Sequence, residues 1–458
     1  MPSSRISISF VLLMLSLSQV ACTYYARRYH WTREAQRHQN NLPIKDAPQN
    51  IDALLPLTER EGHPYFKADF QRALDKSSHS RLSQGNLLTL LLNDKSHIER
   101  IKLIGQAKKT VYVATHHMFN DQHGYEFTNA MIGAKKRGLD VRLVLEGGVP
   151  QGSFGSTCRR RLFNAGVLVA RTPSARSLLT TDMRVHDKIL VIDGVIAVTG
   201  GQNIGSPWAK GDGFNGYFRD TDVRAVGPVV IDMARRFLHM WRELKPDDEA
   251  LRRYEIELAT AEKQFQEAGR VGHEHYGQWL NAPSVKGLCR FVSQDPHHDN
   301  FDLLNTYTIL TNSARRHVIF HVPSFNGIGD EQREEFMTNL KRLASSKARR
   351  VDVITNGPGL TKNDMLSPFL GSMFARYTLA QVFDSVYDSN INVHIYRAWI
   401  HSKVYLFDSH LVAIGGLNLD ETSTRWTESA ILCMDDGLVD SARHMFAKDL
   451  VNSRLMPP

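Results

Sequence analysis

The sequence contains little cysteine. Four cysteines, Cys22, Cys158, Cys289 and Cys433, are spread over 458 residues, and they form no CxxC pair. This spacing provides neither a zinc-binding cluster nor the dense disulfide framework of small secreted domains. We therefore predict that Cys158, Cys289 and Cys433 are isolated thiols, buried or partly buried.

Long apolar runs are equally scarce. The run at residues 6–20 (ISISFVLLMLSLSQV) carries no charge and follows Arg5. It is near the lower length limit for a helix that spans a bilayer, so residues 1–25 are predicted to be a signal peptide or a membrane anchor. The small residues before Cys22 resemble the approach to the lipidated cysteine of lipoproteins, which makes Cys22 a candidate lipidation site.

Basic residues follow this apolar run. Arg27, Arg28, Arg33 and Arg37 come directly after it, and basic residues beside an apolar segment tend to stay in the cytoplasm. Membrane attachment is therefore expected, and either face of the membrane stays open.

Composition excludes a disordered chain. Hydrophobic residues make up 42% of the sequence and charged residues 23%, which is typical of a folded protein with one large core or two ordinary domains. The formal net charge of +8 favours polyanionic partners, either nucleic acid or an anionic membrane surface.

Apolar segments and helical patterns alternate from about residue 86 onward, which predicts an α/β fold with largely parallel sheets covered on both faces. Strands are expected at 110–114, 141–145 and 167–170, and again at 317–322, 351–355 and 392–396; helices are expected at 125–137 and 332–344. The same order in both halves indicates an internal duplication. The predicted units are an extension packed on the surface (26–85), a first lobe (86–245), a linker helix (246–285) and a second lobe (286–458).

One motif occurs in both halves. The first half contains HDKILVID (186–193) and, six residues later, GGQN (200–203); the second contains HSKVYLFD (401–408) and, again six residues later, GGLN (415–418). A single histidine in a strand is usually an ordinary core or surface residue, whereas six positions with identical spacing in both halves indicate a shared site. These positions are His186, Lys188, Asp193, Gly200, Gly201 and Asn203, and His401, Lys403, Asp408, Gly415, Gly416 and Asn418.

The two motifs resemble those of the phospholipase D superfamily, in which HxKxxxxD followed by GGxN occurs twice. GGQNIG (200–205) and FRDTDVRAVGPVV (218–230) are similar to segments of bacterial cardiolipin synthases and related phospholipases. The resemblance covers about residues 86 to 450. It implies two α/β lobes with one active site at their interface, and a membrane-associated protein of the bacterial cell envelope.

The resemblance also implies a mechanism without a metal or another cofactor. Lys188 and Lys403 would neutralise the non-bridging oxygens of a phosphodiester, with Asn203 and Asn418 as additional donors. One histidine would attack phosphorus and the other would act as acid and base. His186 is assigned as the nucleophile and His401 as the acid/base, although near symmetry leaves the reverse open.

Carboxylates complete the predicted site. Each histidine needs a carboxylate on its second ring nitrogen, and we assign Asp220 to the first motif and Glu428 to the second. Asp193 and Asp408 are expected to hold turns and neighbouring donors. The glycines are assigned to the motif's structure.

Three other polar segments receive ordinary interpretations. His116 and His117 end a strand and are expected to lie on the surface or behind the site, with a place at the substrate entrance as the alternative. Residues 295–299 (DPHHD) are not expected to bind metal, because adjacent histidines in a loop point in different directions. Arg159, Arg160 and Arg161 are expected to form a solvated face, with anionic headgroups as an alternative partner.

The function predicted from these residues is that of a lipid enzyme, either a phosphatidyltransferase or a hydrolase. Its expected partners are an anionic phospholipid and the membrane surface. The alternatives are a nuclease of the same superfamily, supported only by the basic charge, and a non-catalytic lipid-binding scaffold. Nucleic acid is disfavoured because no basic groove rich in aromatic residues is recognisable.

Overall fold

The computed structural model describes residues 45–147, 156–173, 184–211, 217–245, 250–323, 331–346, 348–356, 386, 389–420 and 423–456. The apolar run at 6–20, Cys22 and the arginines that follow lie outside the described residues.

The first lobe is built on a mixed sheet. In the described residues it has seven strands in the order β1-β7-β6-β5-β2-β3-β4. The strands are β1 (Leu87–Leu92), β2 (Thr110–Thr115), β3 (Asp140–Leu145), β4 (Leu168–Arg171), β5 (Ile189–Ile192), β6 (Ile196–Gly200) and β7 (Thr221–Val226).

The second lobe repeats this topology. Read from its far edge, its described sheet has the order β8-β14-β13-β12-β9-β10-β11-β15, so each strand of the first sheet has a counterpart and β15 is added. The strands are β8 (Leu288–Gln294), β9 (His317–His321), β10 (Arg350–Thr355), β11 (Asn392–Tyr396), β12 (Val404–Phe407), β13 (Leu411–Gly415), β14 (Glu428–Met434) and β15 (Ser453–Leu455). The internal duplication is confirmed.

The expectation of largely parallel sheets was wrong. Only β2, β3 and β4 are parallel to one another, as are β9, β10 and β11, and the other described pairings are antiparallel. The reason is that β5 and β6, like β12 and β13, are joined by tight turns, and tight turns reverse the chain.

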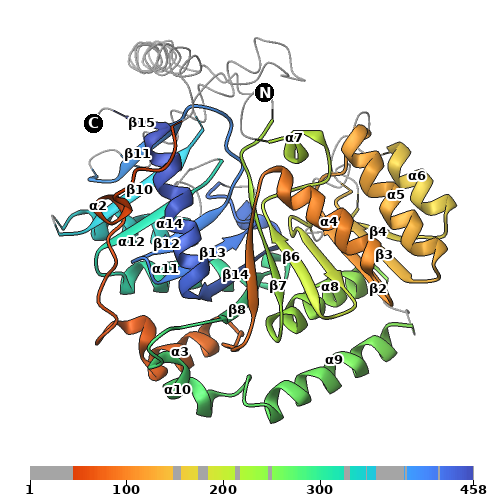
Figure 1. Ribbon diagram of the computed structural model, residues 1–458, viewed down its shortest axis with the longest axis horizontal. Coiled ribbons are helices and arrows are strands. Elements are labelled where there is room, and N and C mark those ends of the chain that lie inside the picture. The colour runs from red at the N-terminus through yellow and green to blue at the C-terminus, as the bar shows by residue number, and fades with distance from the viewer. Residues whose placement is uncertain are drawn as a thin grey trace, which may run out of the picture.

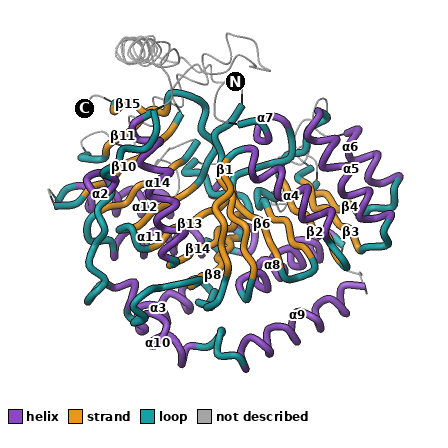
Figure 2. Tube along the Cα trace, in the orientation of Figure 1, coloured by secondary structure: helices purple, strands orange, loops and turns teal. Residues whose placement is uncertain are grey.

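Helices cover the outer faces of both sheets and fill the space between them (Figure 1). Figure 2 shows the strands at the centre of the molecule and most helices around them. Alternate side chains of β2, for example Val111 and Tyr112, face the outer and the central core, as the pleat requires.

The outer face of the first sheet packs on α4 (Asp94–Gln106), α5 (Gln122–Lys136) and α6 (Ser156–Asn164). The outer face of the second sheet packs on α3 (Ala68–Ser77), α10 (Tyr276–Leu280), α11 (Asp302–Ser313) and α12 (Glu331–Ala344). The central core contains α8 (Val229–Leu244) and α14 (Asp436–Val451). Short helices are α2 (Ile51–Leu54), α7 (Ser206–Ala209), η1 (Pro64–Phe66), η3 (His273–His275), η4 (Pro296–His298) and η5 (Ser423–Arg425).

The linker contains helix α9 (Ala250–Glu267), which runs along the lower edge of the molecule in Figure 1. Its apolar stripe, including Leu251, Tyr254 and Leu258, is buried in the central core as the spacing predicts. Glu262, one turn after Leu258 on the same side of the helix, pairs with Arg81 and Arg235.

The segment before β1 is more than a surface extension. His63 and Tyr65 are fully buried, and Nε2 of His63 lies 2.9 Å from Oδ2 of Asp408 in the second lobe. The prediction of a segment packed on the surface was therefore wrong for these residues. His63 contacts Asp408, and Tyr65 belongs to the hydrophobic core of the second lobe.

The prediction of isolated thiols was wrong for two of the three cysteines. Cys158 is a buried free thiol, as predicted, but Cys289 and Cys433 form a disulfide between β8 and β14. These residues are direct partners in the strand register, with Cα atoms 4.2 Å apart. They are 144 residues apart in sequence, and only strand pairing brings them together.

A membrane-crossing segment is not found in this part of the chain: none of the described helices has both the length and the apolar content needed to span a bilayer.

The disulfide generates a stability prediction. Closing a loop of 144 residues stabilises a folded chain by up to about 5 kcal/mol in the chain-entropy model. We expect reduction by dithiothreitol to lower the free energy of unfolding by a few kcal/mol, as measured by urea denaturation. A Cys289→Ala/Cys433→Ala variant should show no such dependence on reductant, and an equal dependence in both proteins would contradict the prediction.

Candidate active site

The two histidine–lysine motifs meet where the lobes join. Each His-x-Lys segment lies immediately before a central strand, β5 or β12, and is tied by the backbone to the other lobe. The N–H of His186 donates to the carbonyl of Thr427 at 3.1 Å, and the N–H of His401 donates to the carbonyl of Arg219 at 2.8 Å. These two crossings are related by the internal duplication, because β7 and β14 hold equivalent places in the two sheets.

Across these contacts, the histidine of each lobe meets a carboxylate of the other lobe. Nδ1 of His186 lies 2.5 Å from Oε1 of Glu428, and Nδ1 of His401 lies 2.7 Å from Oδ2 of Asp220. Our assignment of Asp220 to the first motif and Glu428 to the second was therefore wrong. Each carboxylate follows its own motif in sequence, but the chain carries it across the seam to the other histidine.

The lysines are buried beside the histidines. Lys188 and Lys403 are each 1% exposed, and each Nζ donates to the backbone carbonyl of its neighbouring histidine at 2.6 Å. Burial lowers the pKa of Lys188 to about 8 against the opposing pull of Glu428. Burial, against Asp220, lowers the pKa of Lys403 to about 7. Two buried ammonium groups would neutralise the negative charge of a phosphodiester.

The two histidine–carboxylate pairs differ in charge. Burial and Lys403 lower the pKa of His401 to about 4, and burial and Lys188 lower that of His186 well below its ordinary value. Burial disfavours ionised Asp220, but His401 and Lys403 outweigh it and hold the pKa of Asp220 below its usual range. Burial raises the pKa of Glu428 well above its usual range. Asp220 is therefore more readily ionised than Glu428.

The second glycine of each GGxN leaves room for a carboxylate. A Cβ atom on Gly201 would lie 2.1 Å from Oδ1 of Asp220, and one on Gly416 would lie 2.4 Å from Oε2 of Glu428. The first glycines, Gly200 and Gly415, lie as closely against the backbone of the neighbouring strand. Alanine at Gly201 or Gly416 would displace the group that orients a histidine.

The asparagines that end the GGxN motifs are placed differently. Oδ1 of Asn203 accepts the backbone N–H of His117 at 3.0 Å, which leaves its amide hydrogens as the donors for another ligand. Asn418 is half-buried, and its backbone N–H donates to Oγ of Ser423 at 3.3 Å.

The motif aspartates lie at the far ends of β5 and β12, away from the histidines. Asp193 accepts the backbone N–H groups of residues 108–110, and Asp408 accepts those of residues 315–317. Both have positive φ, 54° and 53°, in the turns that follow the strands. Each therefore holds the turn against the start of the adjacent strand, β2 or β9.

Aromatic residues that we did not assign to the site surround the histidines. The ring of Trp426 lies 5.4 Å from His186, Phe218 stacks on His401 at 5.3 Å, and Trp399 lies 5.3 Å from Phe218. A signal for them exists, because each stands two residues before a predicted site residue: Glu428, Asp220 and His401, respectively. Residues two apart in extended backbone share a face.

His116 is also part of this environment. It is buried, its Nδ1 lies 2.9 Å from the carbonyl of Val185, and its ring lies 4.7 Å from that of His186.

Arg161 lies on α6, over the ring of Tyr125 at 5.6 Å.

The comparisons with known proteins agree with this geometry. The family model "Cardiolipin synthase, PLD-like domain" matches residues 100–210 and 307–450. The cardiolipin synthase of Clostridium perfringens (strain SM101) is 25% identical over 384 residues, which are 82% of this chain and 72% of that protein. Cardiolipin synthase 1 of Bacillus cereus is 24% identical over 439 residues, 92% of this chain and 78% of that protein.

A solved structure shows the same fold. The phosphatidylserine synthase of Haemophilus influenzae Rd KW20 superposes with a TM-score of 0.57 at 13% sequence identity, covering 84% of this chain and 91% of that one.

The crossed pairing can be tested without an activity assay. We expect His186→Ala and Glu428→Gln to be coupled in a double-mutant cycle of unfolding free energy, by about 0.5–3 kcal/mol, because the side chains are in contact. His186→Ala and Asp220→Asn should be closer to additive. Coupling of His186 with Asp220 but not with Glu428 would contradict the crossed arrangement.

The lysine pKa values predict a pH dependence. A lysine whose pKa is lowered is charged below that pKa and neutral above it. We therefore expect kcat/KM to fall as the pH rises through about 7, where Lys403 loses its proton. Because arginine stays charged, the fall should move to higher pH in Lys403→Arg, even if its activity is lower. An unchanged alkaline limb in that variant would exclude Lys403 as its source.

Proposed function

We propose that this chain, which belongs to the PLD-like domain family of cardiolipin synthases, transfers the phosphatidyl group of a phospholipid to an alcohol. The observation that carries the proposal is the convergence of two histidine–lysine pairs, each with a carboxylate from the other lobe. His186 and both lysines are buried, and His401 is partly buried. Such a site holds fixed positive charge for a phosphodiester and two imidazoles for its chemistry. Cardiolipin formation is the reaction that we favour, and hydrolysis is the same chemistry with water as acceptor.

The lysines would bind the substrate phosphate. Lys188 and Lys403 are buried and carry a positive charge below their pKa values of about 8 and about 7. A phosphodiester between the charged lysines would exchange its hydration for two fixed ammonium groups. Asn203 and Asn418 would add neutral donors. This arrangement stabilises the charge that builds on the non-bridging oxygens as a fifth ligand approaches phosphorus.

His186 would attack first. Its Nδ1 is taken by Glu428, so Nε2 is the nitrogen that forms the bond to phosphorus while the bond to the leaving alcohol breaks. His401 donates a proton to the departing oxygen. In the second half, His401 takes the proton of the incoming alcohol, whose oxygen attacks phosphorus and releases His186.

The charge difference between the two pairs supports this assignment of roles. Asp220 keeps its negative charge and opposes the burial and the Lys403 charge that lower the pKa of His401, so His401 gains a proton more readily than His186 does, as the acid step requires. A nucleophile must be neutral, and burial and Lys188 favour neutral His186. The roles rest on this asymmetry, since the geometry of the two motifs is nearly equivalent.

Membrane attachment belongs to the same proposal. The substrate is a membrane lipid, and the apolar run at 6–20 would bring the site to it, either as an anchor or, if Cys22 is lipidated, through an acyl chain. The net charge of +8 favours an anionic surface.

The test is a product assay in mixed micelles of phosphatidylglycerol, and separately of phosphatidylethanolamine, without added metal and with products identified by mass spectrometry. We expect cardiolipin from the wild type and a loss of roughly 100- to 1000-fold in Lys403→Ala, as for the removal of one fixed donor. Lys245→Ala, an exposed lysine on the same chain, is the matched control and should retain activity.

The other outcomes are equally informative. Phosphatidic acid alone would make the protein a hydrolase. Cleavage of DNA in a parallel reaction, with no lipid product, would replace the lipid substrate by nucleic acid. Full turnover by His186→Ala would overturn the covalent mechanism.

A further inference from the structure

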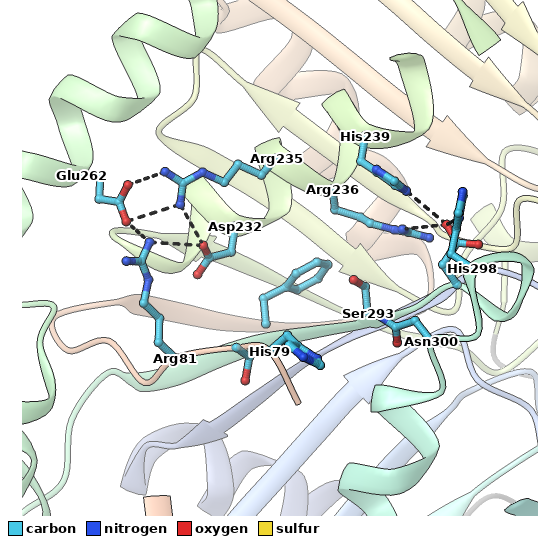
Figure 3. A pocket seen from close by; sticks show the side chains of 13 residues that line it. His79, Arg81, Asp232, Arg235, Arg236, His239, Glu262, Ser293, His298 and Asn300 are labelled. Carbon is cyan, nitrogen blue, oxygen red and sulfur yellow. Dashed lines mark hydrogen bonds and ion pairs between the residues drawn. The ribbon is translucent and has the colours of Figure 1, made fainter. Parts of the chain in front are cut away.

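A second group of polar side chains lies apart from the histidine–lysine site, in a cavity of about 840 Å³ between α8 and the loop after β8 (Figure 3). Helix α8 belongs to the first lobe, and β8 and η4 to the second. His239 comes from α8, Asp295 follows β8, and His298 ends η4. The cavity therefore lies on the seam between the lobes.

Three donor atoms converge in this cavity. Nε2 of His239 lies 3.2 Å from Oδ2 of Asp295, and Nδ1 of His298 lies 3.5 Å from the same oxygen. One ligand atom from each of the three residues lies within 4.8 Å of the others. Ligands bound to one tetrahedral zinc ion at 2.0–2.1 Å are about 3.3 Å apart, so this spacing is close to that of a loaded site.

The carboxylate is buried and incompletely satisfied. Asp295 is 4% exposed, and its Oδ1 has no hydrogen-bond partner among the described residues. Arg236 approaches only its other oxygen, Oδ2, at 3.5 Å. A buried carboxylate oxygen without a donor is costly. Both histidine nitrogens approach Oδ2, so a cation between them would also satisfy Oδ1 if the carboxylate bound it through both oxygens.

A carboxylate lies near the second ring nitrogen of His298, within ion-pair range but beyond hydrogen-bond distance. Nε2 of His298, the nitrogen that faces away from Asp295, lies 3.9 Å from Oε2 of Glu243. Ligating histidines commonly direct their second nitrogen to a carboxylate, which sets the tautomer of the ring. Glu243 stands one helical turn after His239 on α8, so one helix supplies both a ligand and this supporting group.

We propose that His239, Asp295 and His298 bind a divalent transition-metal ion, with zinc as the best match to two imidazoles and one carboxylate. Three protein ligands leave a fourth position for water on the cavity side. The ion would bridge α8 of the first lobe and the β8–α11 loop of the second, and thereby hold together the seam at which the catalytic histidines meet.

The site reaches the catalytic motif through one side chain. Arg236, next to Asp295, also binds both carboxylate oxygens of Asp187, at 3.3 and 3.1 Å, and Asp187 stands between His186 and Lys188. The ion itself does not contact the histidine–lysine site, so its role is structural.

The loop 295–299 was predicted not to bind metal, because its adjacent histidines were expected to point in different directions. In the structure His298 lines the cavity, and His297 is not among the lining residues. The second histidine ligand instead comes from α8, more than 50 residues earlier, which no local spacing could reveal.

The experiment is zinc titration of the untagged full chain by isothermal calorimetry and thermal unfolding, with magnesium in parallel. We expect one zinc ion per chain at this site, a Tm raised by several degrees, and no comparable effect of magnesium. His239→Ala and His298→Ala should lose the zinc-dependent shift, and His297→Ala is the matched control that should keep it.

The variants also separate a metal site from a merely structural cluster. Loss of the His239–Asp295 hydrogen bond would lower Tm in His239→Ala with or without zinc, whereas only a metal site makes the difference depend on zinc. No zinc effect on the wild type would overturn the proposal. A zinc effect that persists in both ligand variants and disappears in His123→Ala would place the ion at His97, His123 and Glu126 instead, and would overturn it as well.

Discussion

Each catalytic histidine is held by a carboxylate that the other lobe supplies, and the rest of the site depends on this exchange. His186 with Glu428 and His401 with Asp220 place four ionisable side chains, beside two lysines, in the interior of the protein. Charges buried in this way are tolerated only when each has a partner, because desolvation costs several kcal/mol per ion. Neither lobe can form a complete site alone, since separation would leave a histidine and a carboxylate unpaired on each side.

The backbone explains how the exchange is built. The segments before β7 and β14 each form a parallel bridge with the segment before the opposite catalytic histidine, Arg219 with Ile400 and Thr427 with Val185. Gly201 and Gly416 have no side chain at the points where the two carboxylates pass. The second glycine of each GGxN motif is therefore needed because any side chain there would collide with the carboxylate. The duplication places such a glycine in both lobes.

The two histidine–carboxylate pairs have nearly the same geometry, but their carboxyl groups differ in pKa. Asp220 also accepts the N–H of Thr221 at 2.7 Å, and its pKa stays low, whereas burial raises the pKa of Glu428. A two-step transfer needs one imidazole that stays neutral and one that gains and loses a proton, and the ionised Asp220 beside His401 favours this division of roles. The aromatic side chains around His186 and His401 exclude water and so strengthen each of these interactions.

Local patterns in the sequence determined the strands, the duplication and the identity of the motif residues. Strands were expected at 110–114 and 351–355, and β2 and β10 lie there within one residue at either end, because short apolar runs between turns specify a buried strand without reference to the rest of the chain. Only the tertiary structure decided which carboxylate meets which histidine, that Cys289 and Cys433 pair, and that His239 joins Asp295 and His298. Each of these contacts joins residues more than 50 positions apart, across a seam or between strands, and depends on which surfaces meet rather than on any spacing along the chain.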